Sequence, residues 1–372
     1  MKSIQQKYGS GLGIVPKYSV ATLFLICLGF GTISCAQTNL KNMPETYVAY
    51  KTGEALIIDG KANENDWENA KWSSLFMDIE GNRQPAYKTQ AKMLWDEDYF
   101  YIYAKMEEPH VWATLKKRDT IIFHNNDFEV FIDPDSDTHN YFEIEINALN
   151  TVWELFINKP YREYDNVALN DWNITGLQTA VHVEGTLNNP DDNDKYWAVE
   201  MAIPFKTFRK SYFEDNVPRN QFWRVNFSRV NWDFEITNNE YSRKKDKNGK
   251  YLSEHNWVWS PIGVINMHLP ERWGYVYFST NKVTEKENFT IPKDEEIKWQ
   301  LAAFYRAQKV FYEKNSTWAK TLDKLLVKPN KIDGKTINYQ MDTHQSGFNI
   351  WVKSPFSNTI ILIKEDGKII VK

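Results

Sequence analysis

The clearest pattern in the sequence is an alternation of polar and apolar residues in two short segments joined by a polar linker. Residues 127–133 have the sequence DFEVFID, and residues 141–147 have the sequence YFEIEIN. Alternation with a period of two is typical of β-strands, whose successive side chains point to opposite faces. The linker is short enough for a hairpin. The pattern therefore predicts two paired strands with one apolar face and one acidic face.

The two faces of this predicted hairpin have different compositions. The apolar face collects Phe128, Val130, Ile132, Phe142, Ile144 and Ile146, whereas the acidic face collects Glu129, Phe131, Asp133, Tyr141, Glu143, Glu145 and Asn147.

Short strand-like runs occur along most of the chain. Examples are QAKMLWDEDYFYIYAKM, YWAVEMAIP and FWRVNFSRV, and turn-forming stretches such as NNPDDND separate them. Regularly spaced short strands with few helical windows are typical of antiparallel sandwiches and jelly rolls. The sequence therefore predicts a mainly β fold, an antiparallel, jelly-roll-like β-sandwich over residues 47–279. Trp67 and Ala70, at helical spacing within Asn63–Trp72, predict one short helix at an end of the sandwich.

The pattern changes in residues 285–372. Pro292 and the acidic residues behind it precede apolar positions at helical spacing, which predicts a long amphipathic helix. Thr317–Leu326 predicts a second helical segment, and Asp366-Gly367 predicts a terminal hairpin turn. We therefore expect a small α+β appendage, a helix plus a hairpin. Its apolar helix positions include Ile297, Leu301, Phe304, Ala307 and Phe311, and its strand-like runs are Phe348–Val352, Thr359–Ile363 and Ile369–Val371.

The first 36 residues are typical of an export signal. Lys2, Lys7 and Lys17 precede the apolar run YSVATLFLICLGFGTISCAQ, which is too short and too close to the N-terminus for a stop-transfer helix. Two endings stay open: cleavage after Ala36, or lipidation of Cys35, because TISC resembles a bacterial lipobox. The mature protein is therefore expected to be exported, as an extracellular or periplasmic protein or as a lipoprotein anchored to the outer membrane.

Cysteine content and charge exclude several classes of function. Cys27 and Cys35 are the only cysteines and both lie in the export signal, so the mature chain has no disulfide, thiolate metal site or thiol nucleophile. Removal of the three signal lysines changes the formal net charge from −4 to −7. An acidic protein is a poor partner for nucleic acid or an anionic membrane.

Three hypotheses compete for the acidic face: a catalytic acid and base, a metal site, or the polar floor of a binding surface. Glycosidases need two carboxyl groups that flank the substrate, and Glu129 and Glu145 are expected to be cross-strand neighbours. Acidic residues are also common on the solvent side of a hairpin. Serine-hydrolase and zinc-protease chemistry find no support, because the sequence has neither G-x-S-x-G nor H-E-x-x-H.

The linker DPDSDTHN, residues 133–140, resembles the start of a calcium loop. Asp133, Asp135 and Asp137 alternate and would offer the oxygen ligands that Ca²⁺ prefers. The linker is not an EF-hand, because Thr138 stands where that loop has glycine and Ile144 where it has glutamate. Calcium here, or at Asp191, Asp192 and Asp194, is therefore one hypothesis, and a plain solvated turn is the other.

Aromatic residues are abundant, with 15 Trp, 20 Tyr and 21 Phe. Trp95, Trp197 and Trp223 follow strand alternation and are expected in the core. Sugar rings present C–H patches and hydroxyl groups, so exposed aromatic rings beside carboxylates and amides suit them as receptors. The better exposed candidates are Trp112, Phe123, Trp257, Trp259, Met267 and His268.

Six ordered blocks of sequence resemble the carbohydrate-binding family 9-like proteins of exported bacterial systems. The resemblance covers residues 47–279 and implies a β-sandwich that binds sugars, often beside xylan-degrading domains, with calcium in some members. The blocks are LIIDGKANENDWENAKW, KMLWDEDYFYIYAKMEEP, NNDFEVFIDPDSDTHNYFEIEINALNTVWEL, YWAVEMAIPF, WRVNFSRV and NWVWSPIGVINMHLPERWGYVYF.

The same resemblance implies positions for a sugar site. Glu129 matches the glutamate of the family's FEVFID-like strand. Sugar-clamping members place one Trp shortly before that strand and another in the loop before the final strand. Here Phe123 stands at the first position, and Met267 or His268 falls near the second. The clamp is therefore altered, and Trp259 or Trp273 could add a different platform. The carbohydrate-binding residues expected on this basis are Phe123, Glu129, Glu143, Trp259 and His268.

The leading hypothesis is an exported, non-catalytic protein that binds polysaccharide or oligosaccharide fragments and supports carbohydrate catabolism. The second is a glycoside hydrolase-type enzyme that uses carboxylates of the acidic face. The third is a structural or assembly protein of the cell envelope whose appendage binds a protein partner. The resemblance to isolated binding modules does not extend to that appendage.

Overall fold

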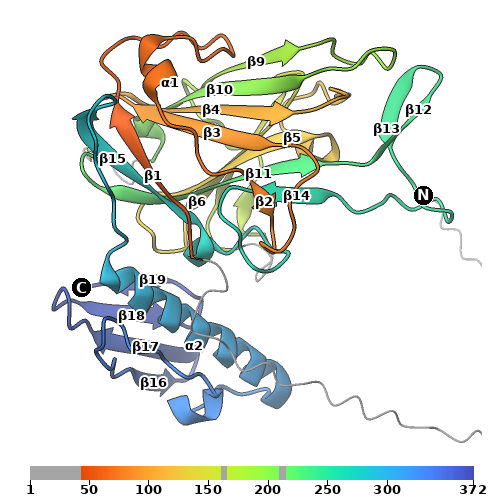
Figure 1. Cartoon of the computed structure of the whole chain (residues 1–372). Helices are drawn as coiled ribbons and strands as arrows, with labels where there is room; N and C mark the ends of the chain where they lie inside the picture. Colours follow the sequence, from red (N-terminus) through yellow and green to blue (C-terminus); the bar gives the residue numbers. More distant parts are fainter. Residues whose placement is uncertain (1–42, 161–165, 209–214) are drawn as a thin grey trace, which may run out of the picture. The chain divides into compact units, whose positions relative to one another are not determined.

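The computed structural model describes residues 43–160, 166–208 and 215–372. Figure 1 shows these residues as a β-rich region followed by a helix and a small sheet. The predicted export signal and Cys35 lie outside the described residues. Within them, no helix combines the length and the apolar character needed to cross a membrane.

Most strands belong to one sheet that folds over on itself. In the described residues this sheet has 13 strands, with β8-β7-β6-β5-β11-β15-β1-β3-β4-β10-β9 as its main order, and β14 joins β11 to β2. Its strands are β1 (Thr46–Lys51), β2 (Met77–Asp78), β3 (Thr89–Trp95), β4 (Tyr99–Glu107), β5 (Asp127–Asp133), β6 (Tyr141–Asn147), β7 (Val152–Ile157), β8 (Ala168–Leu169), β9 (Gln178–Glu184), β10 (Tyr196–Pro204), β11 (Phe222–Asn231), β14 (His255–Val258) and β15 (Gly274–Lys282).

Strand β1 connects the two halves of the sheet. It pairs in parallel with β15 from Thr46 to Tyr50, and then with β3 at Tyr50 and Lys51, with a break in register between these two residues. A strand that changes partners in this way lets the sheet turn a corner and cover its own apolar face. The predicted antiparallel β-sandwich is confirmed, with β1 as a parallel exception.

The core between the two halves is built from strand residues of one face. These side chains are fully or almost fully buried, as period-two alternation requires. Representative members are Met93, Ile102 and Val199 from β3, β4 and β10, and Phe128, Ile144 and Val225 from β5, β6 and β11.

A short helix, α1 (Asn65–Asn69), forms where the sequence predicts one. Its Trp67 is fully buried, and the indole N–H donates a 2.9 Å hydrogen bond to Glu200 on β10. A hairpin of β12 (Phe234–Thr237) and β13 (Glu240–Arg243) forms a separate two-stranded sheet.

The C-terminal appendage has its own apolar core. It contains the predicted long helix, α2 (Lys293–Asn315), which packs against a four-stranded antiparallel sheet. The expected hairpin is thus part of a larger sheet, and the second helical segment is reduced to a 3-10 turn, Leu322–Leu325. The four strands are β16 (Gln340–His344), β17 (Gly347–Lys353), β18 (Ile360–Lys364) and β19 (Ile369–Val371).

Candidate functional site: a buried carboxylate cluster beside a cavity

Strands β5 and β6 pair in the register that the alternation predicts. Glu129 lies directly opposite Glu145, and Phe131 opposite Glu143. Phe128 and Ile144 point into the core between the two halves of the sandwich. The carboxylates are therefore gathered on the other face of the hairpin.

This acidic face is buried rather than solvated. Asp127, Glu129 and Glu145 are 0%, 6% and 2% exposed. A second apolar layer packs over neighbouring positions of the same face, because the segment that follows β14 returns across it. This layer joins Phe131, Tyr141 and Leu155 to Val258, Ile262, Met267, Leu269 and Trp273.

Beside this layer lies a cavity of about 470 Å³. Its volume falls within the range of roughly 300 to 1,000 Å³ that is typical of small-molecule sites. Its wall combines aromatic, acidic and amide side chains from distant parts of the sequence. The aromatic ones are Phe123, Phe131 and Trp153, and the polar ones include Glu129, Glu143, Glu145, Asn166, Asn170, Glu254, Asn256 and His268.

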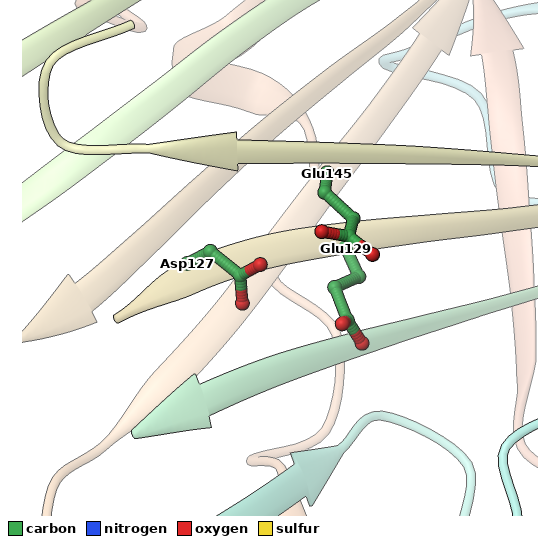
Figure 2. A group of neighbouring side chains, drawn as sticks. All are labelled: Asp127, Glu129 and Glu145. Atoms are coloured by element: carbon green, nitrogen blue, oxygen red, sulfur yellow. The ribbon is translucent and has the colours of Figure 1, made fainter. Parts of the chain in front are cut away.

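Three carboxylates meet at the edge of the cavity. Figure 2 shows Asp127 and Glu129 on β5, with Glu145 beside them on β6. One oxygen from each group lies within 4.8 Å of the others. Glu129 and Glu145 contribute to the cavity wall, whereas Asp127 is not among the residues that line it. We call Asp127, Glu129 and Glu145 the carboxylate cluster.

Burial and mutual repulsion change the acidity of the cluster. Burial raises the pKa of Asp127 and of Glu145 well above the usual range, and the neighbouring carboxylates raise both further. Burial also raises the pKa of Glu129 to about 7, although the Ser228 hydroxyl opposes this change. Charged forms of buried carboxyl groups are unfavourable unless a cation or several donors compensate them.

Few donors face the cluster. The backbone N–H of Phe123 donates a 2.9 Å hydrogen bond to Oε2 of Glu145. Neither oxygen of Asp127 accepts a well-formed hydrogen bond, and the backbone N–H of Val230 is the donor that acts on its pKa. Within residues 43–160, 166–208 and 215–372, no lysine or arginine forms an ion pair with any of the three. The cluster is therefore acidic without internal neutralisation.

Four of the five expected carbohydrate-binding residues line this one cavity, namely Phe123, Glu129, Glu143 and His268. Met267 joins them. The Nδ1 atom of His268 lies 2.9 Å from the Tyr141 hydroxyl, which fixes the imidazole ring. Their roles toward a ligand stay a prediction, but the structure brings these distant positions together.

The expected exposure of Trp259 is wrong. Its side chain is 1% exposed and packs in the core between the two halves, against Phe227 and above Gly274, and not on the cavity wall. It follows β14 directly, and its backbone N–H bonds to the carbonyl of Phe227, so the ring continues the strand's inward face. The expected exposure is also wrong for four further candidates, which are almost fully buried: Trp112 at 2%, Trp257 at 4%, Met267 at 8% and His268 at 4%.

Trp153 is the residue that the sequence analysis missed. It lies directly opposite Glu145 on β7, is partly exposed, and lines the cavity. Its indole N–H is buried without an acceptor. The signal was present in the sequence, because the alternation in VWELFI places Trp153 and Leu155 on the acidic face if β7 pairs with β6.

The predicted calcium loop brings its three aspartates together. Oxygens of Asp133, Asp135 and Asp137 lie within 4.8 Å of one another. Asp133 accepts a 2.9 Å hydrogen bond from the Thr138 N–H, and Asp137 pairs with Lys368 at 3.0 Å. Burial, with Asp135 and Asp137 nearby, raises the pKa of Asp133. Calcium at this loop stays a prediction.

The second candidate calcium position is organised for a structural purpose. Asp194 accepts hydrogen bonds from the backbone N–H groups of Val111 at 2.7 Å and Thr186 at 2.6 Å. Asp191 and Asp192 do not join it in any cluster suited to a metal among the described residues. The aspartate therefore ties two loops together.

Comparison with known proteins gives a family match. Residues 58–222 match the family described as Carbohydrate family 9 binding domain-like. Among curated proteins, no sequence matches the chain.

Two of the solved structures that are similar to the chain have low sequence identity to it. A candidate carbohydrate-binding protein from Bacteroides uniformis ATCC 8492 has 15% identity and a TM-score of 0.47, over 63% of this chain and 99% of that one. A family 9 carbohydrate-binding module from Caldicellulosiruptor kristjanssonii, solved with cellotriose and with glucose, has 13% identity and a TM-score of 0.40, over 66% of this chain and 100% of that one. The family match agrees with the resemblance seen in the sequence, and it covers residues 58–222.

Proposed function

We propose that the protein binds carbohydrate in the cavity over β5, β6 and β7. The family match supports carbohydrate binding as the class of function. The observation that carries the proposed location is the wall itself, which places aromatic rings beside the buried carboxyl groups of Glu129 and Glu145. Sugars need both, because their C–H faces pack on rings and their hydroxyl groups donate to acceptors.

Each wall residue has a distinct role in this proposal. Phe123 and Trp153 offer ring surfaces, and the indole N–H of Trp153 supplies a donor without an acceptor of its own. Glu129 and Glu143 accept hydroxyl hydrogen bonds. His268, whose ring is fixed by Tyr141, borders the site on the side of the covering segment.

The biological setting follows from the predicted export signal. We infer that the mature protein is exported, either secreted freely or anchored through a lipid on Cys35, and that it captures polysaccharide or oligosaccharide fragments for degradation. N-terminal analysis of the exported protein tests the first part: a start at Cys35 or Gln37 is expected, and retention of residues 1–34 would contradict it.

A glycan array followed by calorimetric titration tests the proposed site. Removal of a charged acceptor is worth roughly 1.5 to 3 kcal/mol, so Glu129→Ala should weaken binding of the best array ligand about ten- to a hundredfold. Phe123→Ala should weaken it as well. If both variants are folded and bind like the wild type, the carbohydrate site lies elsewhere.

Glycoside hydrolysis is the second candidate function. The specific observation in its favour is that burial raises the pKa of Glu129 to about 7 with two further carboxyl groups nearby, as in the acid of a glycosidase. Release of reducing sugar from a panel of polysaccharides tests it. Turnover that disappears in Glu129→Gln would establish catalysis, and binding without turnover would leave the protein a binding protein.

A further inference from the structure

A second cavity, of about 460 Å³, lies on the other face of the strand pair β11 and β14. Among the described residues, none lines both cavities. Val230 and Asn256 are directly opposite each other and line the first cavity, whereas the next cross-strand pair, Asn231 and His255, lines the second. Because successive side chains of a strand point to opposite faces, the second cavity is a separate site and not an extension of the first.

The most buried part of the second cavity's wall is held by an internal ion pair. Glu108 belongs to this wall and accepts hydrogen bonds from Arg229 at 2.6 Å and from Asn231 at 3.0 Å. The guanidinium group of Arg229 lies 5.0 Å from the ring centre of Trp257, which also lines the cavity. All four side chains are buried. Buried polar groups that already have partners are rigid, so the shape of this cavity is formed before a ligand binds.

The more exposed part of the wall carries hydrogen-bond donors and acceptors in pairs. Nη2 of Arg83 lies 3.3 Å from Oδ2 of Asp78, and Nε2 of His255 lies 3.4 Å from Oδ1 of Asp233. Every acidic side chain of the described wall therefore lies beside an arginine or a histidine, whereas the first cavity has several carboxyl groups and no arginine or lysine in its described wall. A wall with balanced charges suits a polar ligand that carries no net charge.

We propose that the second cavity binds a neutral carbohydrate and forms a sugar site separate from the first. Tyr87 contributes a partly exposed aromatic ring, held edge-on against Trp257 with 6.1 Å between the ring centroids. The C–H face of a sugar packs on such a ring, while its hydroxyl groups donate to the Asp78 carboxylate and accept from the Arg83 guanidinium. The volume lies within the range of roughly 300 to 1,000 Å³ that is typical of small-molecule sites. This inference rests on the proposed function for the class of ligand, but not for the location of the first site.

Calorimetric titration with cellobiose, xylobiose and mannobiose tests the second site, because a disaccharide is short enough to occupy a single cavity. We expect at least one of these neutral probes to bind the wild type at two sites. Trp153→Ala should remove the first site only. Tyr87→Ala should weaken the second site at least about tenfold, since it removes the ring surface. Arg83→Ala removes an exposed donor and should weaken the second site by roughly two- to tenfold.

Arg219→Ala is the matched control for Arg83→Ala. Arg219 is also exposed and pairs with Asp215 at 2.8 Å, but it lines neither cavity, so both sites should keep their affinity. Urea melts establish which variants are folded, and Arg83→Ala decides the question if Tyr87→Ala is not.

The possible outcomes distinguish this inference from the proposed function. Binding that remains in Trp153→Ala and weakens in Tyr87→Ala or Arg83→Ala supports the second site, even if the first site is absent. A single site that Trp153→Ala removes, and that folded Tyr87→Ala and Arg83→Ala leave unchanged, would overturn the second site and keep the first. If none of the three disaccharides binds at millimolar concentration, the second site is rejected, and the glycan array still decides the first.

Discussion

Buried carboxylates contact both faces of the strand pair β5 and β11: Glu108, which follows β4, on one face and the carboxylate cluster on the other. On the core face, Glu108 reaches Arg229 of β11, with 2.6 Å between Oε2 and Nη2. Asn126 and Asn231 also donate to Glu108, at 3.2 and 3.0 Å. On the other face, the carboxylate cluster holds three acidic groups and no arginine or lysine among the described residues.

The difference between Glu108 and the carboxylate cluster distinguishes a buried carboxylate with a structural role from buried carboxylates that can bind a ligand. Glu108 is as buried as Glu145, but Arg229, Asn126 and Asn231 donate hydrogen bonds to it. These donors oppose the rise in the pKa of Glu108 that burial causes. Burial of the carboxylate cluster costs free energy too, but no described lysine or arginine forms an ion pair with it. Acceptors of this kind are available to a ligand from outside the chain, which is the reasoning behind the proposed carbohydrate site.

The largest expected effect comes from breaking the matched group. Arg229→Met leaves Glu108 buried without its cation and should reduce the free energy of unfolding by about 3 to 5 kcal/mol. Denaturant melts measure this loss, with Arg243→Met, a partly exposed arginine on β13, as the control. A loss below about 1 kcal/mol, the usual value of a surface ion pair, would mean that the Glu108–Arg229 pair does not stabilise the core.

A core substitution on the same strand tests whether the two faces act separately. Phe128 is 0% exposed between the two halves of the sandwich, so Phe128→Ala should cost about 3 to 5 kcal/mol of stability. Its effect on carbohydrate binding should arise only through unfolding. Titrations at a temperature where the variant is fully folded check this, and a large loss of affinity there would show that the faces are coupled.

Neutralising one member of the carboxylate cluster should stabilise the protein. Asp127→Asn removes a buried acidic group that lies beside two others and should raise the free energy of unfolding by roughly 1 kcal/mol. Parallel urea melts of the wild type and the variant measure the change. A loss of more than about 1 kcal/mol would instead indicate that Asp127 makes a stabilising interaction in the wild type.

Glu200 is a third buried carboxylate, and the pH dependence of its contribution to stability extends the comparison. Glu200 has donors but no cation: N–H groups of Trp67, Gly60 and Asp59 lie 2.9, 3.0 and 3.0 Å from its oxygens. Burial raises its pKa to about 7, although these hydrogen bonds oppose the change. Because the folded pKa exceeds the ordinary value of 4.5, its contribution to stability is complete below that pH and is lost as the pH rises through about 7.

Urea melts of the wild type and Glu200→Gln at two pH values measure this contribution. The stability advantage of the wild type over the variant should be larger at pH 5 than at pH 8. An equal difference at both values would show that Glu200 does not titrate in this range.

Local alternation was sufficient to predict the hairpin of β5 and β6, its register and its two faces. It was not sufficient for the environment of the acidic face, because the segment that covers it follows β14, more than a hundred residues later in the chain. Trp153 was missed for a related reason: its face depends on which strand β7 pairs with. Trp259 was misplaced because it continues an inward strand face beyond the end of β14.

The C-terminal appendage also contains a strand that local sequence patterns did not predict. The apolar runs of β17, β18 and β19 predicted strands, and α2 followed from its helical spacing. Strand β16 was missed because it lies at the edge of its sheet and most of its residues are exposed, which leaves no apolar alternation to find. Edge strands of this kind are recognised only through their partner.

The most direct test of the carbohydrate site compares two tryptophans. Trp153 lines the cavity, whereas Trp72 is 40% exposed and packs beside Tyr103, away from the cavity wall. In calorimetric titrations with the best array ligand, Trp153→Ala should weaken binding at least about tenfold, equivalent to about 1.4 kcal/mol. Trp72→Ala should bind like the wild type. If Trp153→Ala is folded and keeps full affinity while Trp72→Ala loses it, the cavity is not the carbohydrate site.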